Sequence, residues 1–279
     1  MSENRVGVIG WPVTHSLSPA MHNAAFAALG LTDWRYDLLP VPPDIVAHSL
    51  RTLRGEGGYV GVNVTIPLKE AVLAHTQPDA LALALGAANT IDFRTNISTN
   101  TDVGGFIDDL GANGVALAGT RTLVLGAGGA ARAAVYGLAR AGADVIVANR
   151  TPERAQAMLA NLASAAGVRG VEAMSLEQAA QTDPSLIVNC TPVGMWPRVD
   201  ACPWPDEIPF PEGATVYDMV YRPAHTRLMA LAVARGGRAV GGLGMLVRQG
   251  AAAFALWTGQ TAPIDVMLAA AQRALAAAG

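Results

Sequence analysis

The chain contains little lysine and little cysteine. Lys69 is the only lysine among 279 residues, so nearly every permanently cationic side chain is an arginine. Cys190 and Cys202 form no short metal-binding pair and no framework of disulfides, and a reducing compartment therefore fits best. The five histidines show no metal-ligand spacing. We expect no metal site and a cytoplasmic location.

Charge is also scarce. Charged residues make up 15% of the chain, and a formal net charge of -3 offers no basic face to a phosphate backbone, so we expect no nucleic-acid partner. The uncharged stretch from Gln249 to Ile264 falls short of the ~20 residues that a membrane span needs. We expect no export signal, because the first residues lack a basic segment followed by a long apolar core. An apolar share of 51% is that of a globular protein, and the length suits two modest domains.

Strand-like runs alternate with helix-length segments in the first part of the chain. The runs VGVIG, WRYDLL and YVGVNV are each followed by a segment that reads as a helix: Ser18 to Leu29, Pro43 to Arg54, and Pro67 to His75. Such alternation predicts parallel strands joined by crossover helices. Another strand is expected near Asn89 to Phe93, followed by the turn-rich TNISTNTD and a linking helix from Val103 to Leu110.

A second alternating series follows, with strands expected in TRTLVLGA, ADVIVANR, LIVNC and TVYDMV and helices from Gly129 to Arg140 and Pro152 to Ala165. This pattern predicts a doubly wound nucleotide fold. The proline-rich segment 192–211 is expected to be an irregular loop. The last two helices, expected at 244–258 and 264–278, have no obvious strand between them. We therefore expect a domain of residues 1–103, with 244–279 packing back on it, and a second domain of residues 104–243.

The segment LVLGAGGAARAAV has the spacing of a dinucleotide-binding turn. It places Gly126, Gly128 and Ala131 directly after an apolar strand and at the start of a helix. Such a turn allows the backbone to approach a pyrophosphate closely, while the helix N–H groups face its charge. Glycine-rich turns also occur for packing alone, but the strand and helix on either side favour the nucleotide reading.

The residues after the next strand favour NADP. An NAD enzyme usually carries an acid there, against the ribose hydroxyls. This chain instead has Asn149, Arg150 and Thr151, with Arg154 one helical turn further on. An arginine–phosphate fork is stronger than a neutral hydrogen bond, so these cations suit a 2'-phosphate. The alternative is that both arginines simply face solvent.

Three polar clusters follow strand-like runs: THSLSP at 14–19, NVTIPLK at 63–69 and NTD at 100–102. Because the carboxyl ends of parallel strands line the ligand crevice of an open sheet, the clusters are expected to converge. Ser16 and Ser18 precede Pro19, a favoured first helical residue, and their hydroxyls suit a small anion at a helix start. The simpler alternative is that Ser18 caps its helix.

Lys69 and Asp102 are the candidates for proton chemistry. Lys69 is expected just inside a helix opened by Pro67, where the helix dipole disfavours a cation and eases proton loss. Oxidation of a secondary alcohol needs a group that exchanges the hydroxyl proton while hydride moves, and a lysine can do this whereas an arginine cannot. Asp102 either caps the helix beginning at Val103 or orients the ammonium and accepts from a substrate. An exposed, inert lysine is the remaining alternative.

Several motifs taken together resemble the shikimate dehydrogenase family over nearly the whole chain. They are GWPVTHSLSPAMHN, NVTIPLK, GAANT, NTDVGGF, GAGGAARA followed by NRT, NCTPVGM, YDMVYRP and GGLGMLVRQGAAAFALWTG. The resemblance implies an α/β protein with an N-terminal substrate domain, a Rossmann-like doubly wound NADP-binding domain, and C-terminal helices that return to the first domain. Ser98 and Val103 stand where glycines often flank NTD, which puts the local loop geometry in question.

The resemblance also implies an activity and a set of site residues. The activity is NADP-dependent interconversion of 3-dehydroshikimate and shikimate, in the biosynthesis of chorismate and aromatic amino acids. We separately expect a monomer or a homodimer, since the sequence does not decide the oligomeric state. Lys69 and Asp102 would form the catalytic pair. The substrate carboxylate would be held by Ser16 and Ser18, aided by Tyr221, and the ring hydroxyls by Asn63, Thr65, Asn89 and Gln249. The cofactor site would comprise Gly126, Ala127, Gly128, Gly129, Ala130, Asn149, Arg150, Thr151, Arg154, Met219 and Gly242.

Two alternatives are open from sequence. A related dehydrogenase would act chiefly on quinate, and a catalytically silent paralogue would bind NADP without turnover. Retention of both Lys69 and Asp102 weighs against the silent paralogue.

Overall fold

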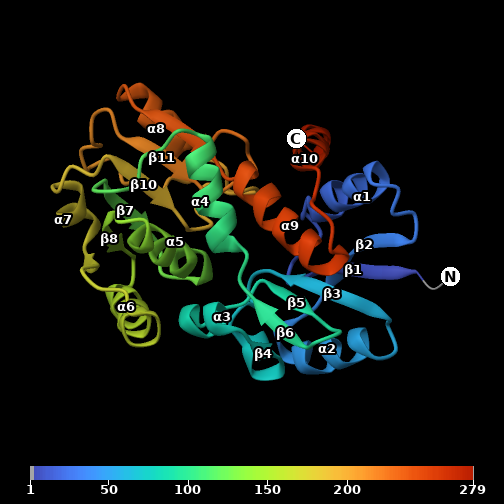
Figure 1. Ribbon diagram of the computed structural model, residues 1–279. Helices are drawn as coiled ribbons and strands as arrows, with labels where there is room; N and C mark the ends of the chain where they lie inside the picture. Colours follow the sequence, from blue (N-terminus) through green and yellow to red (C-terminus); the bar gives the residue numbers. More distant parts are fainter. Residues whose placement is uncertain (1–2, 279) are drawn as a thin grey trace. The chain divides into compact units, whose positions relative to one another are not determined.

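The computed structural model describes residues 3–278, and the chain divides into two compact units. Unit 1 contains the residues up to Gly105 and those from Leu246 onward, and unit 2 runs from Phe106 to Met245. Figure 1 shows a β-sheet with helices in each unit. The helices α4 (Asp102–Ala112) and α9 (Leu243–Thr258) each begin in one unit and end in the other.

The sheet of unit 1 has the strand order β2-β1-β3-β5-β6-β4. Its strands are β1 (Asn4–Gly10), β2 (Trp34–Pro40), β3 (Tyr59–Val64), β4 (Gln77–Pro78), β5 (Thr90–Asp92) and β6 (Ile97–Thr99). Strand β1 pairs in parallel with β2 and β3, as the alternating pattern predicts. Strand β5 is antiparallel to both β3 and β6, so the expectation of parallel strands is wrong at this side of the sheet. Only residues 93–96 join β5 to β6, too few for the crossover that a parallel pair requires.

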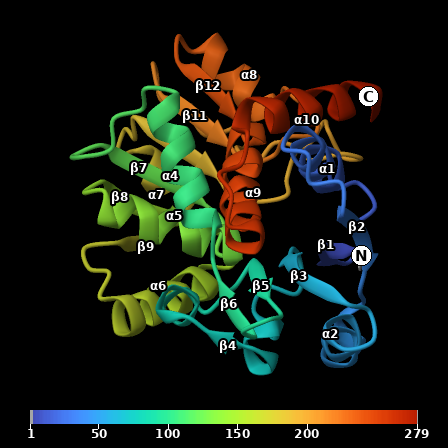
Figure 2. The ribbon, with the colours of Figure 1, turned by 45° about the vertical axis from the view of Figure 1, so that its right-hand side comes forward.

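Helices cover both faces of this sheet. They are α1 (Ser18–Ala28), the 3₁₀ helix η1 (Pro43–Ile45), α2 (Val46–Arg54), the 3₁₀ helix η2 (Ala71–His75), α3 (Ala80–Leu85), the later part of α9, and α10 (Ile264–Ala278). Figure 2 shows α2 on one side of the sheet and α1 beside α10 on the other. Strands β4 and β6 and helix α3 were not predicted, because each is too short for a periodic pattern to reveal. Strand β6 lies in the segment TNISTNTD, which was expected to be turn-rich.

The helix expected from Pro67 to His75 is wrong. Residues 66–67 and 69–70 form turns, and only Ala71–His75 are helical, as the 3₁₀ helix η2. The carbonyl oxygen of Lys69 accepts a hydrogen bond from the N–H of Ala88, at 2.8 Å, and so it does not serve an α-helical turn. The dipole argument for Lys69 loses its basis, because no α-helix begins at Pro67.

The chain's last part is fixed to the sheet through the end of α9. The indole N–H of Trp257 donates to the carbonyl of Ile91, at 3.1 Å. The guanidinium of Arg94 pairs with Asp92 and also donates to the carbonyl of Trp257, at 3.0 Å. A cation at this position satisfies a carbonyl at the helix C-terminus, which carries partial negative charge. These contacts set where α9 runs along unit 1.

Unit 2 is a six-stranded parallel sheet in the order β12-β11-β10-β7-β8-β9. Its strands are β7 (Arg121–Leu125), β8 (Asp144–Ala148), β9 (Glu172–Met174), β10 (Leu186–Asn189), β11 (Thr215–Asp218) and β12 (Arg238–Gly241). The chain moves outward from β7 to β9 and then returns to the other side of β7 with β10, so the order reverses between β7 and β10. This is the doubly wound nucleotide fold, and the predicted fold class is confirmed.

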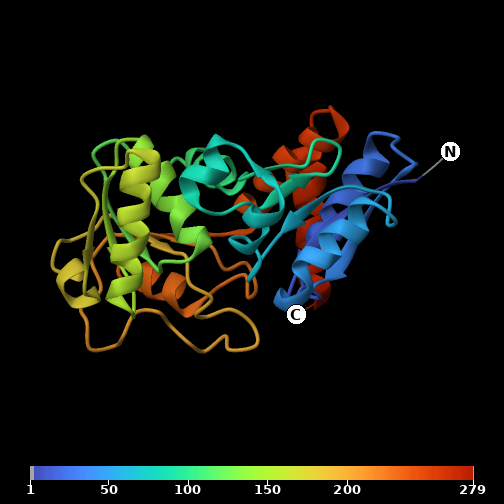
Figure 3. The ribbon, with the colours of Figure 1, turned by 90° about the horizontal axis from the view of Figure 1, so that it is seen from below.

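The crossover helices of unit 2 are α5 (Gly129–Arg140), α6 (Pro152–Ala166), α7 (Leu176–Ala180) and α8 (Arg227–Ala234), and α4 leads into the sheet. Figure 3 shows α5 and α6 on one face of the sheet and α8 on the other. The expected bounds of α5 match the structure, and those of α6 differ by one residue. Elements β9, α7, α8 and β12 were missed, while 192–211 contain no strand or helix, as expected. Between residues 3 and 278, no helix has the length and hydropathy to cross a membrane.

His22 lies at the centre of the aromatic packing between α1 and the sheet. It is fully buried, and its ring stacks on Tyr36 with 4.3 Å between centroids. Phe254 and Trp257 of α9 pack around the same ring. Within the described residues neither ring nitrogen has a hydrogen-bond partner. Burial therefore lowers the pKa of His22 to about 3, because the imidazolium would be charged and unsolvated.

This burial predicts an acid-sensitive stability. In the unfolded chain His22 is protonated near its ordinary pKa of about 6.5. In the folded protein the same imidazole stays neutral down to about pH 3. Stability from this residue is present above about pH 6.5 and is lost as pH falls, at about 1.4 kcal/mol per pH unit. Urea unfolding of wild type and His22→Leu between pH 7 and 5 should show the steeper decline in wild type. Parallel declines in the two proteins would contradict the buried neutral imidazole.

Candidate active site

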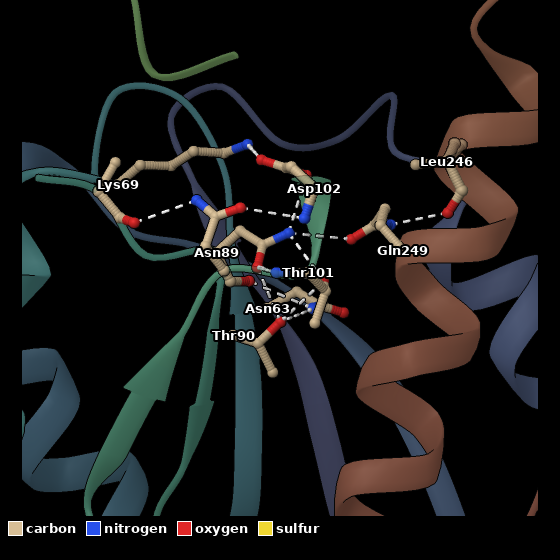
Figure 4. Close-up of polar contacts among 10 residues, drawn as sticks. Asn63, Lys69, Asn89, Thr90, Thr101, Asp102, Leu246 and Gln249 are labelled. Carbon is tan, nitrogen blue, oxygen red and sulfur yellow. Dashed lines mark hydrogen bonds and ion pairs between the residues drawn. The ribbon is translucent and has the colours of Figure 1, made fainter. Parts of the chain in front are cut away.

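A lysine and a carboxylate meet in unit 1, at the carboxyl end of β3 and the start of α4. The Nζ of Lys69 donates to Oδ2 of Asp102 at 2.6 Å (Figure 4). The two side chains are 16% and 6% exposed, so this ion pair is largely shielded from water. Residues that are 33 positions apart in sequence thus form one functional unit. The alternative of an exposed, solitary lysine does not hold.

Asp102 occupies the first position of α4. The N-terminus of a helix carries partial positive charge, so this is a favourable place for a carboxylate. Both carboxylate oxygens accept from side chains: Oδ2 from Lys69 and Oδ1 from Nδ2 of Asn89, at 2.8 Å. The alternative that Asp102 caps a helix beginning at Val103 is therefore wrong, because the helix begins at Asp102 itself and its carboxylate faces the lysine.

Asn89 is the centre of the polar network around the ion pair (Figure 4). Besides Asp102, its Nδ2 lies 3.0 Å from Thr101 Oγ1 and 3.2 Å from Gln249 Oε1. Its Oδ1 accepts from the N–H of Thr101 at 2.7 Å and from the hydroxyl of Thr90 at 3.0 Å. Because Nδ2 carries only two hydrogens for three acceptors, the charged oxygen of Asp102 should be preferred. The main role of Asn89 is thus to orient the carboxylate of Asp102.

Asn63 is held from both sides by buried groups. Its Nδ2 donates to the hydroxyl of Thr90 at 3.0 Å and to the carbonyl of Asn89 at 3.2 Å. Its Oδ1 accepts from the hydroxyl of Tyr36 at 2.8 Å. Burial raises the pKa of Tyr36 far above its usual range, so the phenol stays protonated and donates. Both hydrogens of Asn63 are used, and only a lone pair on Oδ1 is left for a ligand.

Gln249 joins this network from α9. Its Oε1 faces Asn89, and its Nε2 donates to the carbonyl of Leu246 at 2.7 Å. The approach of α9 depends on Gly105, where an added Cβ would lie 2.7 Å from the backbone nitrogen of Gln249. Such a distance is well inside van der Waals contact. A glycine on α4 is therefore required for Gln249 to reach the strand ends.

The two serines lie at the start of α1. Leu17 occupies the N-cap position with no side-chain cap, so the alternative in which Ser18 caps the helix is wrong. The hydroxyl of Ser16 accepts from the N–H of Ser18 at 3.2 Å, and Ser18 is 4% exposed. Thr65 follows β3, and its N–H donates to the carbonyl of Ile9 at 2.9 Å. The side chain of Ser18 forms a hydrogen bond with Tyr36, whose hydroxyl donates to Asn63 of the network around the Lys69–Asp102 pair.

In unit 2 the glycine-rich turn joins β7 to α5. Gly126 has a φ of 111°, in the region that only glycine enters readily, and a Cβ there would lie 3.1 Å from Cγ2 of Thr191. The turn after β7 thus abuts the loop after β10, where the strand order reverses. Gly128 is the N-cap of α5 and supplies no side-chain cap, and no atom lies within 4 Å of its would-be Cβ. The first N–H groups of α5 are left for an anion.

The candidate NADP residues lie around this turn, after β8. The side chain of Asn149 donates to the carbonyl of Thr151, at 2.8 Å, and so shapes its loop. Arg150 and Arg154 are exposed, and neither makes a side-chain hydrogen bond or ion pair with the described residues. Their guanidinium donors are therefore available.

Sequence reasoning missed a buried network at the ends of β10 and β11. Asp218 is fully buried and accepts from Nδ2 of Asn189 at 2.9 Å, from the N–H of Val220 at 3.0 Å and from the hydroxyl of Thr226 at 2.6 Å. Burial raises the pKa of this carboxyl. The motifs NCTPVGM and YDMVYRP contain these residues, but their pairing depends on which strands are neighbours.

Met219, Tyr221 and Gly242 lie beside this network. The N–H of Met219 donates to the carbonyl of Asn189 at 3.0 Å. A Cβ on Gly242 would collide with the carbonyl oxygen of Met219, so the start of α9 packs directly on this loop. Burial raises the pKa of Tyr221, and its hydroxyl is therefore a donor at neutral pH. Within residues 3–278 no group of His, Cys, Asp and Glu could hold a metal ion.

A doubly wound sheet with an uncapped glycine-rich turn, together with a shielded ammonium–carboxylate pair, is typical of a nucleotide-dependent dehydrogenase of the α/β class. Three family models match the chain in succession. They are the shikimate dehydrogenase substrate binding domain over residues 8–91, the shikimate/quinate 5-dehydrogenase over 110–188, and the shikimate 5'-dehydrogenase C-terminal domain over 242–272.

Curated relatives of the same family align with nearly the whole length of the chain. A shikimate dehydrogenase (NADP(+)) of Methanocella arvoryzae is 44% identical over 96% of this chain and 98% of its own. One of Symbiobacterium thermophilum is 45% identical over 97% and 94%. The solved shikimate 5-dehydrogenase of Thermus thermophilus, in complex with NADP(H) and shikimate, is 42% identical over 97% and 99%, with a TM-score of 0.87. The chain belongs to the shikimate dehydrogenase family, as its motifs predicted.

Proposed function

We propose that this chain is an NADP-dependent shikimate dehydrogenase, which reversibly reduces 3-dehydroshikimate to shikimate on the route to chorismate and the aromatic amino acids. The observation that carries the proposal is the 2.6 Å contact between Lys69 Nζ and Asp102 Oδ2, in a chain whose full-length relatives bear this name. This pair has the chemistry that interconversion of a ketone and a secondary alcohol requires.

Lys69 exchanges the proton of the C3 oxygen. When reduction forms an alkoxide there, the ammonium donates its proton, and in the reverse direction the amine accepts one. The Oδ2 of Asp102 accepts one hydrogen bond from Lys69 Nζ. The other hydrogen-bonding positions of Nζ are left for the substrate. Asn89 keeps the carboxylate in this orientation through Oδ1. The bound nicotinamide supplies or receives the hydride.

Unit 1 serves as the substrate domain in this proposal. Ser16 and Ser18 hold the substrate carboxylate. Tyr221 belongs to unit 2, and its phenol, which burial keeps protonated, is a further candidate donor to that carboxylate. The ring hydroxyls are addressed by Asn63, Thr65, Asn89 and Gln249. Since both hydrogens of Asn63 are already used, it acts there as an acceptor.

Unit 2 serves as the NADP domain. NADP fits the chain's own groups, because the open turn at Gly128 and the free N–H groups of α5 suit a pyrophosphate. The unengaged guanidiniums of Arg150 and Arg154 suit the 2'-phosphate. Residues 126–130, Asn149, Thr151, Met219 and Gly242 complete the proposed cofactor site. A cytoplasmic location and a monomeric or homodimeric state also belong to the proposal.

An absorbance assay at 340 nm tests the activity directly. The purified protein should form NADPH from shikimate and NADP⁺, with a kcat/KM well above that for quinate and above that for shikimate with NAD⁺. Preference for quinate would assign the quinate activity instead. Absence of turnover with every pair, in a folded protein that binds NADP⁺, would indicate a silent binding protein.

Lys69→Met should lower kcat by about 10² to 10⁴, the usual contribution of positioned proton transfer, with little change in KM. Lys69→Arg is the matched control, because it keeps a cation beside Asp102 but cannot readily release a proton. Both variants should be slow, and circular dichroism should show that both are folded. Turnover of Lys69→Arg near wild type would assign the lysine a purely electrostatic role.

Arg150→Ala should raise the dissociation constant of NADP⁺ about 10- to 100-fold and that of NAD⁺ less than about 3-fold. The reason is that a hydrogen bond to a charged group is worth about 1.5–3 kcal/mol, and only NADP⁺ carries the 2'-phosphate. Arg140→Ala is a suitable control, since Arg140 is also exposed but lies at the far end of α5 from the glycine-rich turn. Dissociation constants by fluorescence titration provide the measurement. Equal losses for both cofactors would exclude the phosphate clamp.

A further inference from the structure

We propose that Asn100 is a positioning residue that sets the spacing of Lys69 and Asp102 through the main chain. Its bonds go to backbone atoms rather than to the ammonium or the carboxylate. The proposal rests on the proposed function, because the spacing affects turnover only if the pair exchanges a proton with the substrate.

The main chain of Lys69 is held at its carbonyl. This oxygen accepts from the N–H of Ala88 at 2.8 Å. A lysine side chain is flexible and has about 2 kcal/mol of rotamer entropy. The position of its ammonium therefore depends on how firmly the lysine backbone is held. The bond to Ala88 fixes that origin in a segment that lacks an α-helical ladder.

The main chain of Asp102 is held at its N–H. This group donates to Oδ1 of Asn100 at 3.0 Å. It is one of the first N–H groups of α4, which have no partner inside the helix. The arrangement is the turn that asparagine commonly makes with the N–H two residues on. Asn100 therefore determines the direction in which Asp102 enters α4.

Asn100 links the two anchors. Its Nδ2 donates to the carbonyl of Ala87 at 3.0 Å, and Ala87 is bonded covalently to Ala88. An uninterrupted path thus runs from Lys69 through Ala88, Ala87 and Asn100 to Asp102, and we call this path the main-chain bracket. Ala87 and Ala88 are fully buried and Asn100 is 3% exposed. Water cannot easily replace a lost bond at such buried groups.

The bracket complements the side-chain contacts of the pair. Asn89 fixes the direction of the carboxylate, whereas the bracket fixes the separation of the two backbones. A displacement of about 1 Å in reacting groups can cost 10²-fold in rate. Loss of the bracket should therefore appear in kcat, while the groups proposed to hold the substrate carboxylate and cofactor stay in place.

Three variants separate a bracket from a simple helix cap. Asn100→Ala removes both bonds. Asn100→Ser can still accept from the N–H of Asp102, since serine makes the same turn more weakly, but it is too short to reach Ala87. Thr258→Val is the matched control in the same unit. Thr258 also donates to one carbonyl, that of Phe254 at 2.8 Å, and accepts from the N–H two residues on, that of Gln260 at 3.1 Å.

The bracket predicts a kcat about 10- to 100-fold lower in both Asn100 variants, with KM for shikimate within about 3-fold of wild type. Asn100→Ser should recover thermal stability relative to Asn100→Ala without recovering kcat. Thr258→Val should lower the melting temperature alone. A wild-type kcat in Asn100→Ser would overturn the bracket, because the cap alone would then suffice. If Asn100→Ala does not fold, the serine variant decides the question.

Amide hydrogen exchange provides a readout that does not need turnover. The Ala88 N–H, which donates to Lys69, should exchange about 10-fold faster in Asn100→Ser than in wild type or Thr258→Val. Unchanged Ala88 protection would overturn the bracket even if kcat fell. A wild-type protein that is inactive on shikimate would instead overturn the proposed function, and Ala88 exchange would still decide the bracket.

Discussion

The contact between Lys69 and Asp102 places two charges where water has little access, with side chains 16% and 6% exposed. Taking charges out of water costs several kcal/mol per ion, which a partner offsets only if the remaining hydrogen-bonding positions are also filled. The second carboxylate oxygen of Asp102 accepts a hydrogen bond from Asn89. The side-chain oxygen of Asn89 in turn accepts from Thr101 and Thr90. The polar residues around the pair are thus a condition for its burial.

Asp218 in unit 2 meets a similar condition without a cation. Its partners are an amide, a hydroxyl and a backbone N–H, all neutral donors. Neutral donors offset desolvation less completely than a salt bridge does, and the raised pKa of this carboxyl is the result. The gain is structural, because Asp218 joins Asn189 at the end of β10 to Val220 and Thr226, which follow β11. Each unit therefore organises its strand ends around a buried carboxylate.

The sequence predicted elements whose formation is local. The bounds of α5 could be read from a strand, a glycine turn and a run of helix formers, and the structure agrees. The helix expected at Pro67 failed because the carbonyl of Lys69 bonds to Ala88, which no local pattern reveals. Lys69 and Asp102 could be singled out by residue type and by their position after strands. The roles of Asn100 and Asp218 could not, because they depend on which backbone groups the finished sheet brings within 3 Å.

Most N–H donors of the side-chain amides in unit 1 are already engaged in internal hydrogen bonds. This limits the hydrogen bonds that these side chains can make to a polyhydroxylated ring. Asn63 has no hydrogen left to donate, and Asn89 has more acceptors than hydrogens. Gln249 uses one N–H on Leu246 and keeps another. Under the proposed function, a substrate hydroxyl near Asn63 must therefore donate, whereas one near Gln249 can accept. A ring whose hydroxyl is replaced by a group unable to donate would leave the Asn63 oxygen's lone pair buried and unmatched. Such a mismatch costs more than a lost apolar contact, so discrimination between ring substituents follows from the protein's internal hydrogen bonds.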